Sequence, residues 1–154
     1  MKLPYETATA GDRALAQLQG ILGEFGCQSF GTMIDVKKGA VIVQFEWRTR
    51  QVSLEASWNG YAAAWLKAHP YKSFHARKTK AQYEDAALKQ ARISVCSVLR
   101  DWVKGQVTAI ECGAMSFECA FLPHLLTHTG QRLADKIKDT NLLPYHDDKE
   151  RNLT

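Results

Sequence analysis

The chain has 154 residues, of which 45% are hydrophobic and 23% are charged, a composition that excludes a disordered protein and fits one folded domain. No stretch approaches the ~18 consecutive apolar residues of a membrane-spanning helix, and the opening MKLPYETATAGDRAL lacks the apolar core of a secretory signal. We therefore expect a cytoplasmic protein without membrane contact, whose net charge of +4 is a mild basic bias.

The first predicted element is an amphipathic helix over residues 11–25. Its apolar side chains recur at helical spacing, and Gly26 follows as a stop signal. Apolar and polar residues then alternate over Val41–Trp47 and again over Val52–Ala56, with an earlier strand before the turn VKKG. We expect three antiparallel strands with one apolar face, and helices that cover this face.

The second half of the chain is predicted to be mainly helical. The segment SWNGYAAAWLKAH predicts a short helix that ends before Pro70, and a long helix of about thirty residues begins near Ala81. Its apolar residues suggest a heptad seam of Leu88, Val95, Trp102 and Ala109, with Ala91, Val98, Gly105 and Cys112 interleaved. Shorter helices follow around Pro123 and over TGQRLADKIKD.

These elements predict one α+β domain over residues 1–143, followed by a polar tail at 144–154. Its order is an N-terminal helix, a three-stranded antiparallel sheet and a helical C-terminal half dominated by one long helix.

The segment CGAMSFECAFLPHLLTH, residues 112–128, has the spacing C-x6-C-x4-H-x3-H and raises the question of a zinc site. His124 and His128 are about one helical turn apart and Cys112 and Cys119 about two, so each pair shares a helix face. On one continuous helix, however, the two pairs point in nearly opposite directions, and the spacing matches none of the strong zinc signatures. We expect buried thiols and surface histidines, and a metal site only if a sharp break in the helix brings the pairs together.

Motifs of common catalytic and cofactor sites are missing from the sequence. There is no glycine-rich phosphate loop, no nucleophile elbow and no H-E-x-x-H pair. We therefore name no catalytic residue, no metal ligand and no cofactor, and we expect a protein that is not an enzyme. The cysteines are expected to be reduced thiols.

The most unusual compositional feature is an acid-free segment between Ala56 and Tyr83. Its cations are interleaved with aromatic rings, a combination that suits a polyanion whose phosphates attract cations and whose bases stack on exposed rings. Two arginines at the tip of the β-hairpin extend this surface if the hairpin lies nearby. The candidate nucleic-acid-binding residues are Lys67, Tyr71, Lys72, Phe74, Arg77, Lys78 and Lys80, with Arg48 and Arg50 from the hairpin.

A purely structural interpretation of this segment is also open. Trp58, Tyr61 and Trp65 are spaced as the core face of the short helix, which leaves Tyr71 and Phe74 for stacking. A basic loop often serves solubility alone. No helix-turn-helix, RNA-recognition or zinc-finger signature accompanies the segment, so we expect any binding to be independent of sequence, with DNA and RNA both open.

Two stretches, VIVQFEWRTRQVSLEA and VTAIECGAMSFECAFLPHLL, resemble segments of small uncharacterised proteins encoded by tailed phages and prophages. The resemblance covers the middle of the chain and includes no diagnostic motif. It implies an accessory role around phage DNA or a host target, and no functional residue comes with it.

Two functions follow as hypotheses. The leading one is a non-enzymatic nucleic-acid-binding accessory protein that contacts phosphates through the basic segment. The alternative is a protein–protein adaptor or inhibitor, which binds a host protein or a second copy through an apolar face of the long helix around Val98, Val103 and Ile110. The long helix exceeds what a small sheet can cover, so either the C-terminal helices fold back on it or a second copy of the chain covers it, as a homo-oligomer.

Overall fold

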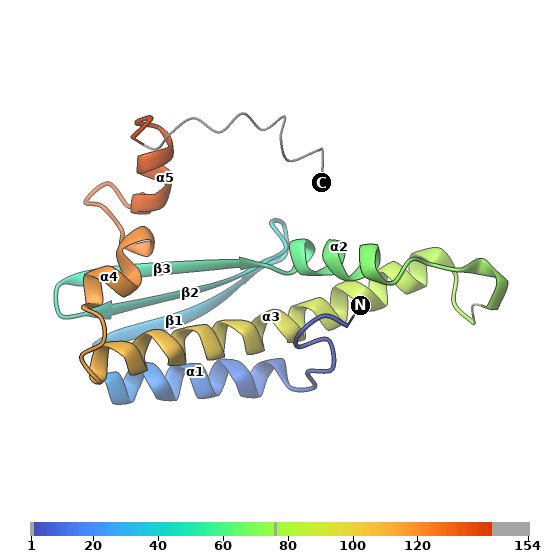
Figure 1. Cartoon of the computed structure of the whole chain (residues 1–154), viewed down its shortest axis with the longest axis horizontal. Coiled ribbons are helices and arrows are strands. Elements are labelled where there is room, and N and C mark those ends of the chain that lie inside the picture. The colour runs from blue at the N-terminus through green and yellow to red at the C-terminus, as the bar shows by residue number, and fades with distance from the viewer. Residues whose placement is uncertain (1, 76, 143–154) are drawn as a thin grey trace.

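The computed structural model describes residues 2–75 and 77–142 and shows the predicted succession of elements (Figure 1). Helix α1 (Gly11–Phe25) precedes the strands β1 (Ser29–Asp35), β2 (Ala40–Trp47) and β3 (Arg50–Ser57). The helical half contains α2 (Trp58–Ala68), the 3-10 turn η1 (Ser73–His75), α3 (Lys80–Glu111), α4 (Phe117–Phe121), the 3-10 turn η2 (Leu122–His124) and α5 (Leu133–Lys138). The α+β order with one dominant helix is confirmed, and the predicted tail at 144–154 lies outside the described residues.

The strands form an antiparallel sheet in the order β1-β2-β3, joined by two short turns. Arg48 and Thr49 connect β2 to β3, and Arg48 has a positive φ of 53°, as a two-residue hairpin turn requires. Between β1 and β2, Gly39 has a φ of 66°, and the side chain of Asn59 fills the place where a Cβ would lie. Glycine is therefore required at this turn for both conformation and space.

One face of the sheet forms the hydrophobic core, as the alternation predicts. Its buried residues are Val41, Val43, Phe45, Val52 and Leu54, which join Leu18 and Leu22 of α1 and Leu99, Val103 and Val107 of α3 in one cluster. The opposite face is less polar than expected, because Ile42 is buried there. Ile42, Met33 and Gln44, together with Leu126, line a shallow concavity of about 370 Å³ on this outer face.

Helices α1 and α3 run parallel to each other on the core face of the sheet (Figure 1). At the start of α1, Gly11 allows a close approach, since a Cβ there would lie 3.3 Å from the Cα of Ile93. Further along, Nη1 of Arg100 donates a 2.9 Å hydrogen bond to Oε1 of Gln17. The two contacts follow the same order along both helices, which fixes their parallel alignment.

The buried side of α3 differs from the predicted heptad seam. Four residues rotate an α-helix by about 400°, so a row with this spacing advances by about 40° around the helix at each step. This row comprises Ala87, Ala91, Val95, Leu99, Val103 and Val107. The predicted seam is wrong at Leu88, Trp102, Gly105 and Cys112, all of which are exposed. The reason is that different elements cover α3 along its length, with α2 beside its first half and α4 at its end.

Beyond α3 the chain returns to the sheet. Gly113, with a φ of 77°, follows the last helical turn, and the Ser116 hydroxyl caps the start of α4. Leu125 then bridges to Val52, and the N–H of Leu126 donates a 2.9 Å hydrogen bond to the carbonyl of Gln51. The chain itself therefore covers part of the β3 edge, whereas within residues 2–75 and 77–142 the β1 edge has no such bridge.

Candidate nucleic-acid interface

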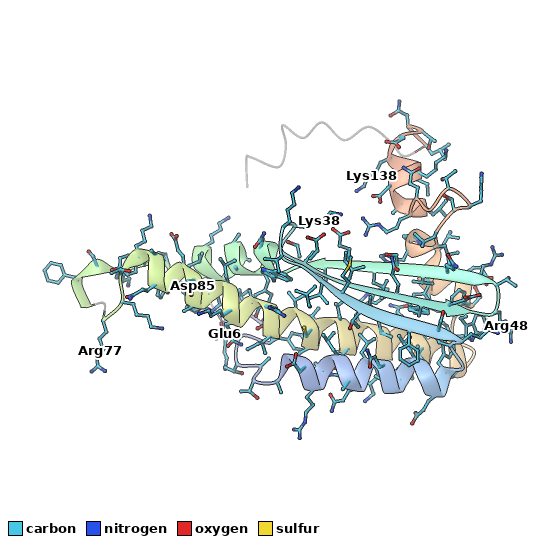
Figure 2. The ribbon with its side chains drawn as sticks, turned by 180° about the vertical axis from the view of Figure 1, so that it is seen from behind. Glu6, Lys38, Arg48, Arg77, Asp85 and Lys138 are labelled. Carbon is cyan, nitrogen blue, oxygen red and sulfur yellow. The ribbon has the colours of Figure 1, made fainter. Side chains whose placement is uncertain are left out.

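The predicted basic segment forms one end of the elongated molecule, beyond the sheet (Figure 1). It includes the last turn of α2, the loop with η1 and the first turn of α3, and Figure 2 shows Arg77 projecting from this end. We call residues 67–75 and 77–80 the basic tip. Its cations are Lys67, Lys72, Arg77, Lys78 and Lys80, and all five side chains are exposed.

Aromatic side chains hold the loop of the basic tip in place. The Tyr71 hydroxyl donates a 2.8 Å hydrogen bond to the Lys78 carbonyl, and the Tyr83 hydroxyl donates one of the same length to the His69 carbonyl. The rings of Tyr71 and Tyr83 lie 5.5 Å apart, and Trp65 stacks on His69 at 4.6 Å. The loop thus has a defined shape, in which Tyr83 takes part although sequence reasoning had not included it.

The start of α3 fixes the other end of the loop. The Thr79 hydroxyl accepts a 3.2 Å hydrogen bond from the Gln82 N–H, and the Gln82 side-chain oxygen accepts a 3.0 Å bond from the Thr79 N–H. This reciprocal pair is a capping box. The first turn of α3 has no acidic residue, so the positive end of the helix dipole adds to the charge of the basic tip.

Carboxylates are scarce around the basic tip. Of its five cations, none forms an ion pair with a carboxylate in the part of the chain that the structure describes. Asp85, one turn into α3, is already paired with Lys89 at 3.0 Å, and Glu6 lies 3.9 Å from the His69 ring nitrogen. The nearest acidic position along α3 is Glu84, which is exposed one turn after Lys80.

The aromatic residues of the segment separate into two roles. Trp58 is buried and Tyr61 packs against the core cluster, so their predicted place on the core face of α2 is confirmed. Trp65 lies outside that cluster and packs on His69 and Tyr83. Tyr71 is half-buried and closes the loop. Phe74, in contrast, is 92% exposed.

The hairpin arginines lie far from the basic tip. Figure 2 places Arg48 and Arg77 at opposite ends of the long axis. The guanidinium carbon of Arg48 lies 4.3 Å from the centre of the Trp47 ring, and Trp47 in turn stacks on Phe117 beyond the end of α3. Arg48 and its neighbour Arg50 therefore do not extend the surface of the basic tip.

The four residues of the cysteine and histidine pattern lie at the end of α3 (Cys112), in α4 (Cys119), in η2 (His124) and in the turn after it (His128). Cys112 and Cys119 are exposed, so the prediction of buried thiols is wrong for both, because α3 ends at Glu111 and the chain changes direction. His128 is exposed as expected, whereas His124 is half-buried. No group of three Cys, His, Asp or Glu side chains within the described ranges is placed to hold a metal ion.

The buried and half-buried thiols belong to the other two cysteines. Cys96 lies in the core of α3, and Cys27 follows α1. Burial raises the pKa of the Cys27 thiol to about 11, which keeps it protonated and unreactive at neutral pH.

The apolar surface required for the adaptor hypothesis is not formed by the three residues that suggested it. Val103 is fully buried, and Val98 and Ile110 are half-buried. Val103 lies in the core cluster and Ile110 packs against it, whereas Val98 lies outside it.

Comparisons with known proteins assign neither a family nor a function to the chain. No protein-family model matches the chain, and neither the curated proteins nor the solved structures gave a significant match. Within residues 2–75 and 77–142, the helices are too short or too polar to cross a membrane.

Proposed function

We propose that the protein is a non-enzymatic accessory protein that binds nucleic acid independently of sequence through the basic tip. One observation carries this proposal: exposed cations and an exposed ring share a loop of defined shape that protrudes from the fold and lacks acidic residues. Long-range attraction of phosphates follows from such a charge distribution.

In this mode, Lys72, Arg77, Lys78 and Lys80 neutralise phosphates while Phe74 stacks on a base. Stacking requires an unpaired base, so binding is stronger to single strands than to duplexes. Tyr71 and Tyr83 hold the loop and do not contact the ligand. We further propose a cytoplasmic location and, following the sequence resemblance, a role in phage or prophage biology.

The test measures fluorescence anisotropy of labelled single-stranded and duplex DNA over a range of salt concentrations. Four neutralised phosphates correspond to a slope of log K against log salt of about −2.8 for single strands and −3.6 for duplexes. Charge reversal of Lys72, Arg77, Lys78 and Lys80 to Glu is expected to abolish binding at physiological salt.

A matched control separates the basic tip from overall charge. Reversal of Lys37, Lys104, Lys136 and Lys138, which are exposed elsewhere on the molecule, gives the same net charge and should retain most of the affinity. If both variants lose the same DNA affinity, net charge alone explains the binding and the proposal is contradicted. It is also contradicted if the wild type does not bind DNA at low salt.

A further inference from the structure

The helix layer of the protein is wider than the sheet that it covers. Neighbouring strands lie about 4.8 Å apart and packed helices about 8–10 Å apart, so two helices side by side match about four strands. This sheet has three strands. Helix α1 packs against β1, whereas α3 packs against β2 and β3, so α1 forms the side of the helix layer at the β1 edge.

The side-chain exposure in β1 is consistent with an edge strand that has no further strand beside it. Phe30 pairs with Phe45 and therefore faces the core side, yet Phe30 is 42% exposed while Phe45 is 3% exposed. Along an antiparallel strand, alternate residues direct their N–H and C=O groups away from the paired neighbour. The strand, SFGTMID, has none of the lysines or prolines that commonly protect a free edge.

A groove lies between the end of β1 and the helices. Its volume is about 540 Å³, and its apolar wall includes Ile34, Leu15 and Ile93. Arg13, Arg92 and Lys89 also line it, of which Lys89 is paired with Asp85, and Asp12 is the carboxylate of the lining. The groove therefore combines an apolar wall with a positive rim.

We propose that the β1 edge and this groove bind an extended peptide of a partner protein as a fourth strand. Its backbone pairs with β1, and alternate apolar side chains fill the space beneath α1 beside Phe30 and Ile34. An acidic residue at the end next to Ile34 meets the cations of the groove.

The experiment selects from a random heptapeptide library, since β1 has seven residues, against the full-length protein. Enriched peptides should alternate apolar residues and carry Asp or Glu at one end. Bound peptide should slow amide hydrogen exchange in β1. Affinity should fall about tenfold in Arg13→Glu, and should stay unchanged in Lys104→Glu, an exposed cation near the other end of α3.

A second pair of variants tests the apolar contact. Phe30 lies outside the core cluster, so Phe30→Lys should fold normally and lose the peptides. Met115→Lys, at a residue with a similar 50% exposure, should retain them, as should the charge-reversed basic tip, which separates this site from the nucleic-acid interface. A library without enriched peptides, or peptides that bind Arg13→Glu and Phe30→Lys as well as the wild type, would overturn the proposal.

Discussion

The imidazole of His124 packs edge-on against Trp102, with ring centroids 5.3 Å apart. Burial of the imidazole, together with the nearby charge of Arg132, lowers its pKa from the usual value. In the unfolded chain histidine regains a pKa of about 6.5, so the unfolded state binds more protons below that pH than the folded state does. The free energy of unfolding is therefore expected to decrease as the pH falls below about 6.5 and towards the lowered pKa.

Urea unfolding at about pH 7 and about pH 5 measures this effect. His124→Gln should show a smaller difference between the two pH values than the wild type, because the titrating group is gone. His128→Gln is the control, since His128 is exposed and its replacement removes a histidine while leaving the packing of His124 on Trp102 in place. Identical pH dependence in His124→Gln and the wild type would refute this role of His124.

At the scale of elements, Gly105 distinguishes the observed packing of α3 from a heptad seam. It is exposed in the middle of α3, and a Cβ built there meets no atom within 4 Å. Gly105→Ala is therefore expected to raise the free energy of unfolding by about 1 kcal/mol, through helix propensity. Gly11→Ala is the comparison, because its Cβ would press on the Ile93 backbone and no such gain is expected. A loss of stability in Gly105→Ala, measured by chemical denaturation, would contradict the exposed position of Gly105 in α3.

The sequence predicts elements better than their contacts. The bounds of α1 coincide with the expected residues 11–25. The helix ends there because Gly26 adopts the left-handed conformation, with a φ of 95°, and this local signal needs no contact with other elements. Strand alternation likewise identified Val41, Val43 and Phe45 as core. The buried face of α3 was not predictable in this way, because it depends on which elements pack along the helix.

At the scale of the molecule, the candidate site also depends on contacts between elements that the sequence does not predict. Composition identified the acid-free segment, and local motifs such as the capping box at Thr79 are visible in sequence. Sequence patterns did not indicate that the hairpin with Arg48 lies beside the far end of α3, since this placement depends on the stacking of Trp47 on Phe117 at 4.5 Å. The peptide groove was missed for the same reason, because β1, α1 and α3 supply it together.

The separation of the two basic ends has a measurable consequence. Helix α3 has 32 residues and so spans about 48 Å, whereas the Debye length at physiological salt is about 8 Å. Arg48→Glu with Arg50→Glu should therefore leave DNA affinity and its salt dependence nearly unchanged. Lys78→Glu with Lys80→Glu should weaken binding and reduce the duplex salt slope by about 1.8.

Fluorescence anisotropy of the two double variants and of their combination provides the measurement. Because the sites are too far apart to interact, the combined variant should bind like the Lys78 and Lys80 variant alone. A hairpin variant that loses as much affinity as the tip variant would show that nucleic acid spans both ends of the molecule. In that case the ligand follows α3 along its length, and the basic tip is one end of a longer contact.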